Sequence, residues 1–519
     1  MLSEGMVGRP RYLNPLLASQ NPVDRQLADL LFNGLTRYDG TGQLVGDLAE
    51  SWTVSEDGLV VTFTLRQDAR WHDGEAVTSA DVAYTYGLLQ APDAAFLPSL
   101  TALWPSVEIE VIDDLQIAFR LPTPYSPFLD ATTLGILPSH LLQDVSAVAL
   151  VEHPFNQMPV GTGLFQIGNS DWQETGRLVL TPVEGQWPQG ILLDGIAFHF
   201  FPSLEDLLAA YRTGQIVSIS NVGPQQVEAV AALEGVRLFF NRQPRYAQLI
   251  FNVAGDNSVV NRRDARQGLA HLLSRDAVVA AAFNGQAVPF AGPILPTSWA
   301  YNPGVSVAYP LHPLSATIQF EAAGFIQSGQ EGATAWTDGE QPLSLTLTYA
   351  GGGNDESVAA AVVDQWAAAG ILIALRPLPL AQFQAALEEG DFEAALVEIS
   401  PPGDPDQYDL WSQESIIDGQ NYGGWNNRLA SEALEEARMS WDLEMRRAAY
   451  TRFQFYFHQD IPALSLFQFT EAYVLGPEVR DLRTPSGLAE IGILRSPRDR
   501  YRGMAGWYVR TVEQPVPCE

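Results

Sequence analysis

The clearest pattern of apolar and polar positions in the chain runs from residue 343 to residue 400. Leu343–Tyr349 alternates as a strand does, Ser357–Ala369 repeats its apolar residues at helical spacing, and Ile371–Leu375 has the pattern of a second strand. A short helix over Phe383–Leu387 and a third apolar strand over Phe392–Ile399 follow. Two successive strand–helix–strand steps predict a βαβαβ unit with parallel strands and right-handed crossovers.

Two loops of this unit are candidate ligand-binding segments. In open parallel sheets, ligands bind beyond the carboxyl ends of the strands. The loops expected at those ends are Ala350–Asp355 and Ser400–Tyr408, and both are rich in Gly, Pro or acidic residues. Loops that form the wall of a ligand site and that a ligand approaches closely are typically rich in such residues.

The remaining chain mixes strand and helix patterns. A hairpin is predicted where the apolar runs Trp52–Val54 and Leu59–Leu65 are joined through an Asp-Gly turn. Thr78, with Asp81 three residues later, predicts the first turn of a helix. The other predicted elements are a strand over Tyr246–Val253, two helices within Asn261–Gly285, a helix over Met445–His458 and a strand over Ala463–Phe469. The chain is therefore expected to be an α/β protein.

Chain length and apolar content predict more than one folded lobe. The protein has 519 residues, of which 46% are hydrophobic and 10% aromatic, so at least two hydrophobic cores are expected. The sequence contains no apolar run of the ~18 residues that a membrane span needs. The folded body is therefore expected to be soluble.

The charge balance is strongly acidic and excludes one class of partner. The chain has 29 basic residues, all of them Arg, against 61 acidic residues, and its net charge is −32. Nucleic-acid binding depends on Lys and Arg that neutralise phosphates, so nucleic acid is not an expected partner. The acidity is explained either by solubility or by a field that favours cationic and zwitterionic ligands over anionic ones.

Several short segments, spread over most of the chain, form a recognisable set of motifs. They are Leu13–Leu16, Gly34–Tyr38, Asp47–Trp52, His72–Val82, Pro159–Gly163, Glu184–Trp187 with Leu193–Gly195, Arg263–Leu269 with Arg275, Asp276 and Gly285, and Asn421–Asn426. In these segments the chain resembles the extracytoplasmic solute-binding proteins of ABC importers, family 5, which includes dipeptide-, oligopeptide- and nickel-binding members. Two positions depart from the family's pattern, which usually has Pro where this chain has Leu164 and Tyr where it has Gln186.

The resemblance implies a two-lobed periplasmic-binding-protein fold, of the large cluster C type, with two hinge crossover strands. Lobe I would comprise residues 1–242 and 470–519 and would carry an extra subdomain at about residues 40–165. Lobe II would comprise residues 243–469. The crossovers are expected near Gln243–Gln248 and Phe467–Ala472.

The same resemblance implies a transport function. The protein would capture a peptide in a cleft between its lobes by hinge closure and deliver it to the permease subunits of an ABC transporter in the membrane. It would be a monomer in the periplasm or on the outer face of the cell membrane, held there by a lipid on a removed N-terminal segment. Cys518, close to the C-terminal end, is misplaced for that lipid and has no expected role.

The sequence motifs do not support an enzyme or a metal-binding protein. The sequence has no G-x-S-x-G elbow, HExxH helix or Walker phosphate loop. His72 lies beside Asp73 and Glu75 as a metal ligand would, but a turn in which hydrogen bonds hold the His explains the segment better. Asp404 and Asp406 have the composition of a glycosidase pair, yet acidic pairs are common in loops. The chain is expected to be no enzyme and to need no cofactor or metal.

Two aspartates in the second candidate loop are the leading ligand-binding candidates. In peptide-binding members that the chain resembles, an aspartate of the matching GDPD segment pairs with the peptide's α-ammonium. Asp404 or Asp406 would be that anchor, since a partly buried ammonium needs an ionised acceptor. Ile399 and Ser400 stand where peptide binders commonly have Trp, and a plain Asp-Pro turn that caps a neighbouring element is the structural alternative.

Aromatic and glycine residues in loops complete the candidate site. Aromatic side chains in polar or Gly-containing stretches are candidates for pocket walls, although such rings also cover hydrophobic cores. Gly351 and Gly352 would present backbone N–H groups to a ligand carboxylate at the start of a helix, unless the loop is a plain connector. The aromatic candidates are Trp299, Tyr301, Tyr408, Trp411, Tyr422 and Trp425.

Two other functions compete with peptide transport. The same scaffold would bind a non-peptide solute, such as an oligosaccharide, an opine or a metal chelate, without needing an aspartate anchor. A signalling or scaffolding protein that has kept the fold and lost transport is the third class.

Overall fold

The computed structural model describes most of the chain. The described residues are 1–18, 21–39, 42–92, 101–183, 193–255, 259–306, 309–328, 335–339, 342–480 and 508–509. Two segments named above, Glu184–Trp187 and Cys518, lie outside them.

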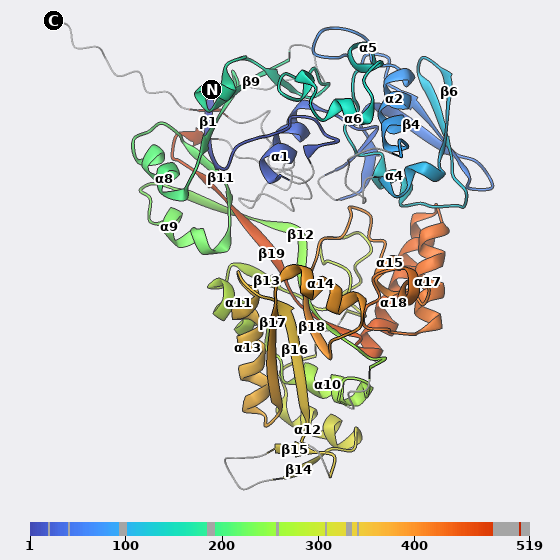
Figure 1. Cartoon of the computed structure of the whole chain (residues 1–519), viewed down its shortest axis with the longest axis vertical. Helices are drawn as coiled ribbons and strands as arrows, with labels where there is room; N and C mark the ends of the chain where they lie inside the picture. The colour runs from blue at the N-terminus through green and yellow to red at the C-terminus, as the bar shows by residue number, and fades with distance from the viewer. Residues whose placement is uncertain are drawn as a thin grey trace, which may run out of the picture. The chain divides into compact units, whose positions relative to one another are not determined.

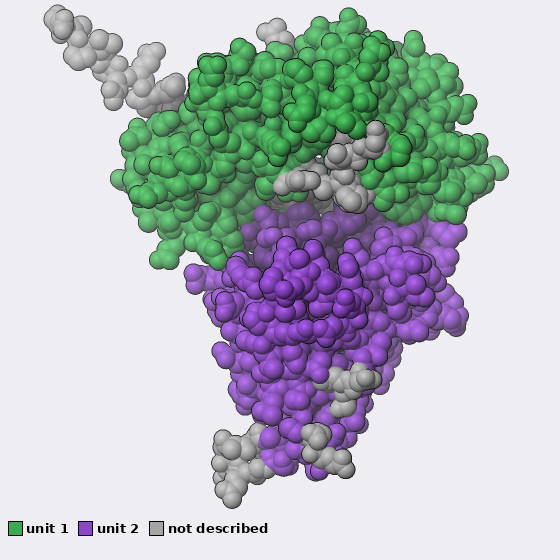
Figure 2. Space-filling model, viewed as in Figure 1, with its two compact units in different colours: residues 1–242, 471–519 green, residues 243–470 purple. Residues whose placement is uncertain are grey.

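The chain divides into two compact units, coloured separately in Figure 2. Unit 1 comprises Met1–Arg242 and Glu471–Glu519, and unit 2 comprises Gln243–Thr470. Two long strands, β12 (Arg237–Phe251) and β19 (Ala463–Leu475), each contain one of the division points. Both expected crossover strands are therefore present in the fold.

Unit 2 is built on the predicted βαβαβ unit, whose strands and helices are labelled in Figure 1. Strand β16 pairs in parallel with both β17 and β18, and β18 pairs antiparallel with β12. The strand order in this unit is β17-β16-β18-β12-β19, and β13 also pairs with β19. The prediction of two parallel crossovers is confirmed. The elements of the βαβαβ unit are β16 (Ser344–Ala350), α13 (Asp355–Ala368), β17 (Leu372–Leu378), α14 (Leu380–Glu388) and β18 (Ala394–Ile399).

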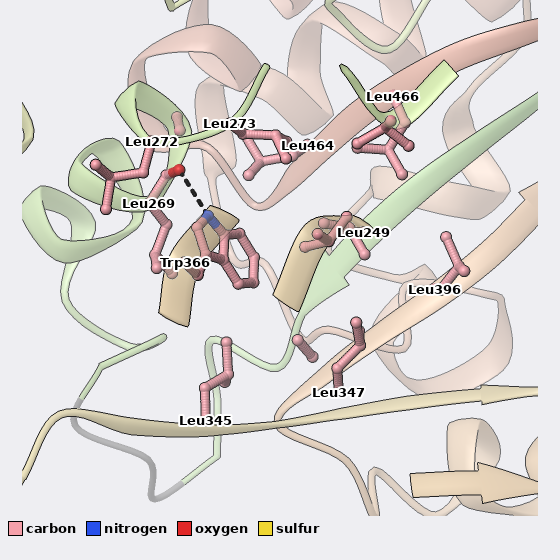
Figure 3. Close-up of a cluster of buried hydrophobic side chains, with 14 of the residues drawn as sticks. Leu249, Leu269, Leu272, Leu273, Leu345, Leu347, Trp366, Leu396, Leu464 and Leu466 are labelled. Carbon is pink, nitrogen blue, oxygen red and sulfur yellow. Dashed lines mark hydrogen bonds between the residues drawn. The ribbon is translucent and has the colours of Figure 1, made fainter. Parts of the chain in front are cut away.

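Alternation along the strands gives this sheet two buried faces. On β12, Leu249 and Phe251 join one hydrophobic cluster while Ile250 between them joins another. The first cluster is covered by α10, α11, α12 and α13, and it includes Trp366, whose indole N–H donates to the Leu269 carbonyl at 3.0 Å (Figure 3). The further elements on this side are α10 (Arg263–His271), α11 (Arg275–Phe283), β13 (Ala287–Pro289), α12 (Pro313–Ala322), β14 (Ile326–Ser328) and β15 (Ala335–Thr337).

The second cluster lies on the opposite face of the same sheet and contains most of the candidate aromatic residues. Ala395 and Val397 of β18 contribute to it from the sheet, and Phe453 and Phe457 contribute from the long helix α18. Unit 2 is therefore a helix–sheet–helix sandwich. The helices on this side, besides α14, are α15 (Tyr408–Trp411), α16 (Ser415–Asp418), α17 (Arg428–Met439) and α18 (Leu443–Asp460).

Unit 1 has a second sheet region around its first strand. Strand β1 pairs in parallel with β10 and with β11, and β9 and β8 extend this part of the sheet by antiparallel pairing. The C-terminal half of β19 pairs antiparallel with β11. The main elements are β1 (Leu2–Val7), α1 (Pro22–Leu31), β2 (Thr36–Tyr38), β3 (Leu44–Gly46), β8 (Phe165–Ile167), β9 (Arg177–Pro182), β10 (Ile196–Phe201), α8 (Leu204–Arg212), β11 (Ser218–Val222) and α9 (Val227–Ala231).

A separate four-stranded antiparallel sheet lies within unit 1, in the order β4-β5-β7-β6. The predicted hairpin is confirmed, since β4 and β5 pair across a turn in which Gly58 has φ 73°. Helix α2 begins after Thr78, whose N–H donates to the Asp81 carboxylate at 2.8 Å as the capping pattern predicts. The elements are β4 (Ala49–Val54), β5 (Val60–Leu65), α2 (Ser79–Leu89), β6 (Glu108–Asp113) and β7 (Gln116–Arg120).

The Pro159–Gly163 segment owes its glycines to close packing against the end of α1. A Cβ atom on Gly161 would lie 1.9 Å from the Leu31 carbonyl oxygen, and one on Gly163 would lie 2.2 Å from the Leu30 carbonyl oxygen. The Gly163 N–H donates to the Leu31 carbonyl at 2.8 Å. This loop is therefore bound tightly to the backbone of α1.

Among the described residues, no helix combines the length and the apolar character that crossing a membrane requires.

Candidate functional site

The first candidate aspartate, Asp404, is held by an arginine of the same unit. It lies in the loop between β18 and α15 and is buried. Arg446 of α18 donates from Nη2 to both Asp404 carboxylate oxygens, at 2.7 and 2.9 Å. The side chains are 9% exposed for Arg446 and 10% for Asp404, so this is a buried ion pair.

The second candidate aspartate is paired in the same manner. Arg438 of α17 lies 2.7 Å from the Asp406 carboxylate through Nη2, and its Nε donates to Asp406 at 2.8 Å. Asp406 also accepts the backbone N–H of Tyr408 at 3.1 Å. Burial raises the pKa of the Asp406 carboxyl, and the charge of Arg438 opposes that rise.

These pairs argue against the expectation that Asp404 or Asp406 pairs with a ligand ammonium, which stays a prediction. Each carboxylate already has a cationic partner, and each is buried within unit 2. The arginines come from α17 and α18, more than thirty residues later in the chain, so nothing in the GDPD segment itself signals them. Ion pairs with Arg438 of α17 and Arg446 of α18 hold the loop in place. This is closer to the structural alternative, in which the turn is bound to a neighbouring element.

The six candidate aromatic residues all belong to the second hydrophobic cluster of unit 2, but the structure divides them into two groups. Trp411 and Trp425 are 2% and 3% exposed. The ring centroids of Trp411 and Phe457 lie 4.9 Å apart, and the Trp425 indole N–H donates to Asp460 at 3.0 Å. Both rings are turned inward onto α18, Trp411 from the end of helix α15 and Trp425 from a loop, so these two tryptophans do not line an open wall as expected.

The other four aromatic residues, Trp299, Tyr301, Tyr408 and Tyr422, are half-buried at the edge of that cluster. The Tyr408 hydroxyl donates to Glu414 at 3.1 Å, and the Trp299 ring packs edge-on against Tyr450 at 5.8 Å. Burial raises the pKa of the Tyr301 and Tyr422 hydroxyls. Each of these four residues packs against the core and keeps part of its surface in solvent.

The Gly351–Gly353 loop does not have the electrostatics of a carboxylate site. The loop is exposed, and the Gly351 N–H is already bound to the Leu378 carbonyl at 2.7 Å. Asp355 and Glu356 occupy the first turn of α13 and already complement the positive end of its dipole. A ligand carboxylate would meet two like charges there, so the expectation for Gly351 and Gly352 is not supported.

A mixed-charge group, missed by the sequence reasoning, lies at the same edge of the sheet. Arg245 of β12 donates from Nη1 to Glu398 near the carboxyl end of β18 at 3.2 Å. The Arg245 guanidinium also lies over the Phe469 ring, 4.0 Å from its centroid. The side chains of Arg245 and Glu398 are 42% and 35% exposed, so both charges remain accessible.

Asp355 belongs to this mixed-charge group through its electrostatics. Burial and the Glu398 charge raise the pKa of its carboxyl, Arg245 opposes the rise, and the resulting pKa is about 6. A usable signal was present in the sequence: Glu398 lies at the end of a parallel strand, and Asp355 ends the loop that follows another parallel strand. Arg245 carried no such signal, since it lies inside the long strand β12.

His72 is held by hydrogen bonds, as the turn interpretation predicts. Its Nδ1 accepts the Gly161 N–H at 3.1 Å, and its Nε2 lies 3.0 Å from the Gly163 carbonyl oxygen. Burial lowers the pKa of this imidazole. In the described part of the chain, no group of three or more His, Cys, Asp or Glu side chains is arranged to hold a metal ion.

Comparison with known proteins agrees with the fold. The family model of bacterial extracellular solute-binding proteins, family 5 (middle region), matches residues 43–417, which is more than half of the chain. The dipeptide-binding protein of Escherichia coli K12 is 23% identical over 500 residues, covering 91% of this chain and 90% of that protein.

Two solved structures of similar fold hold ligands other than peptides. NikZ from Campylobacter jejuni in complex with Ni(L-His) has a TM-score of 0.70 at 22% identity and covers 98% of this chain and 99% of its own. The binding protein AgaA from A. tumefaciens R10 in complex with agropinic acid has a TM-score of 0.67 at 21% identity, with 99% of both chains covered. The chain has the α/β fold of periplasmic binding proteins and belongs to the bacterial extracellular solute-binding proteins, family 5.

Proposed function

We propose that the protein captures short peptides outside the cytoplasm and delivers them to the permease subunits of an ABC importer. Family membership supports solute binding for such an importer, and the name of the E. coli relative supports a peptide as the solute. Binding and release, rather than chemistry, is the expected activity. The monomeric state, the lipid anchor and closure of the lobes about the crossover strands stay predictions.

The observation that supports this function most directly is the mixed-charge group at the carboxyl edge of the unit 2 sheet. A free peptide carries an ammonium at one end and a carboxylate at the other. Glu398 and Asp355 provide anionic acceptors for the ammonium, and Arg245 provides a planar donor for the carboxylate. One accessible edge of the sheet therefore offers both charges that a zwitterion needs.

This assignment moves the ammonium acceptor away from the GDPD loop. Asp404 and Asp406 already neutralise Arg446 and Arg438, and displacing either arginine would leave a buried charge uncompensated. Glu398 has no such obstacle, because its partner Arg245 is itself accessible. The proposed ligand contacts are therefore Arg245, Glu398 and Asp355.

The half-buried aromatic residues are proposed as the apolar part of the ligand site. Trp299, Tyr301, Tyr408 and Tyr422 present partly exposed rings on one side of the unit 2 sheet. Such rings offer apolar area together with a polar edge, which suits ligands whose side chains vary. Broad peptide specificity follows if the charged termini are fixed and the side chains rest against these rings.

A non-peptide solute is the second candidate. NikZ in its solved complex holds Ni(L-His), and AgaA holds agropinic acid, so the same fold accommodates an amino-acid chelate and an opine-type acid. The mixed-charge group of this chain accepts any small solute with both an ammonium and a carboxylate. Identity of the bound species decides between the two candidates.

Native mass spectrometry of the purified protein, followed by mild denaturation, tests the function. A heterogeneous set of short peptides released from the protein is the expected result. A single chelate, opine or sugar would replace the peptide assignment by the second candidate. If nothing is released, titration with a pool of di- to pentapeptides decides, and no binding from that pool overturns the proposal.

A further inference from the structure

Arg446 joins three segments of unit 2 that are distant in sequence. Its Nη2 donates to both oxygens of Asp404, in the loop after β18, and lies 3.4 Å from the Tyr450 hydroxyl. Its Nε donates to the Ala437 carbonyl near the end of α17 at 2.9 Å. A planar guanidinium with several donors in fixed directions suits this role better than an ammonium.

The same guanidinium faces one of the half-buried aromatic residues. Its Cζ lies 5.0 Å from the centroid of the Trp299 ring, within the range of a cation–π contact. The Trp299 ring also packs edge-on against Tyr450, with centroids 5.8 Å apart and an angle of 69° between the planes. Trp299 lies outside regular helices and strands, so the orientation of its indole depends on side-chain contacts such as these two.

A second arginine repeats the arrangement nearby. Arg438 pairs with Asp406 and with Asp409 at 2.9 Å, and its guanidinium lies 4.2 Å from the centroid of the Tyr408 ring. Each aspartate of the GDPD segment is thus bound to an arginine that also covers an aromatic ring. The repeated combination indicates that the aspartates act on the rings through the arginines.

The charge of Arg446 is maintained despite its burial. Burial alone would lower the pKa of the guanidinium, but Asp404 and Tyr450 beside it raise the pKa overall. A charged guanidinium is what a cation–π contact with Trp299 needs. Asp404 is therefore the counterion that allows a buried cation to face the indole.

We propose that Arg446 is a positioning residue: together with its counterion Asp404, it fixes the indole of Trp299 in the orientation that a bound ligand meets. The part of this inference that concerns ligand rests on the proposed function, whereas the orientation of the indole does not. Asp404 thereby has a role in the site without touching the ligand.

The orientation is tested by fluorine NMR of the full chain labelled with 5-fluorotryptophan. The Trp299 resonance is assigned by its loss in Trp299→Phe. In Arg446→Met this resonance shifts or broadens, and in Arg446→Lys, which keeps the charge without the planar fork, it shifts less. An unchanged Trp299 resonance in folded Arg446→Met overturns the proposal, whether or not the protein binds peptides.

The matched control is Arg266→Met. Arg266 of α10 is similarly buried, since the whole residue is 5% exposed against 7% for the whole of Arg446, and it donates to the backbone carbonyls of Val260, Asp460 and Ile461. This variant loses stability as Arg446→Met does, but it leaves the Trp299 resonance in place. If both variants move that resonance equally, loosening of the unit explains the effect and the positioning role is wrong.

A double-mutant cycle extends the test to ligand, with tri-alanine as the probe and its dissociation constant as the readout. Trp299→Leu and Arg446→Met each weaken binding about tenfold, the order expected for loss of a desolvated aromatic contact, and together they weaken it no further. Additive losses overturn action through Trp299. If tri-alanine does not bind the wild type while the NMR result holds, the positioning role stands, and the peptide assignment is decided by the pool of di- to pentapeptides.

Discussion

At the residue scale, the two aspartates of the GDPD segment show the limit of reading a site from a short motif. The sequence places acidic side chains in a loop beyond a parallel strand, where a ligand is expected. Whether a carboxylate is open depends on its partners, and Arg438 and Arg446 come from helices that are distant in sequence. The position of the loop was predictable, but the pairing of its charges was not.

Asp404→Asn is expected to destabilise the protein by about 3 kcal/mol, because it leaves the Arg446 charge buried without a partner. Arg446→Met combined with Asp404→Asn is expected to regain part of that loss, since both charges are then removed. Urea denaturation at neutral pH measures these differences.

Asp409→Asn is the matched control for Asp404→Asn. Its side chain is 73% exposed and pairs with Arg438 at the surface, so a change below about 1 kcal/mol is expected. If Asp404→Asn abolished ligand binding and left stability unchanged, the carboxylate would be a ligand anchor and the ion-pair interpretation would be wrong.

Asp355→Asn is expected to change how stability depends on pH. The folded pKa of about 6 lies above the ordinary value of 3.8, so the protonated form is favoured by folding. The contribution of this carboxyl to stability is present below about pH 4 and is lost as pH rises through about 6. The variant should therefore gain stability relative to the wild type between pH 4 and pH 7.

Denaturation of both proteins at several pH values across this range measures the effect. Asp364→Asn, which removes an exposed carboxylate from the same helix α13, is the control and should show no such trend. A constant difference between Asp355→Asn and the wild type would contradict the assigned pKa and its cause, burial beside Glu398.

At the element scale, periodicity alone predicted the βαβαβ unit and its parallel pairing. Helix α13 and strands β16, β17 and β18 lie within three residues of their expected bounds, because each carries a clear apolar repeat and most are separated by Gly or Pro. The aromatic residues of the loops were harder to place. Trp411 and Trp425 are in loop-like sequence, yet their rings complete the core against α18, which no local pattern reveals.

Gly163→Ala tests the packing of the Pro159–Gly163 loop on α1. The added Cβ would lie 2.2 Å from a backbone oxygen, so the loop or the helix end must move. A loss of about 2 to 3 kcal/mol is expected, as for other overpacked sites. Chemical denaturation measures it.

Gly223→Ala is the control for the loop, because a Cβ at that position would meet nothing within 4 Å and its φ of −71° suits any residue. It should leave stability almost unchanged. Equal stability of the Gly163→Ala variant and the wild type would mean that the close approach to α1 does not constrain the loop.

At the scale of the whole molecule, the family motifs in the sequence were more informative than its periodicity and composition. Periodicity and composition indicated an α/β protein with several cores, which many unrelated functions share. The spaced motifs identified the family, and the family model and the fold agree with them. Ligand identity was less accessible, because it depends on a few charged side chains that different parts of the chain bring to one edge of the sheet.

The measurement that tests the central claim most directly is calorimetric titration with tri-alanine and its N-acetylated and C-amidated forms. The mixed-charge group predicts that free tri-alanine binds and that blocking either terminus weakens binding by at least about tenfold, since a charge-assisted contact is lost. Glu398→Gln should discriminate less between the free and N-acetylated peptides. Equal binding of all three peptides, or of none, would contradict recognition of a zwitterionic peptide at this edge.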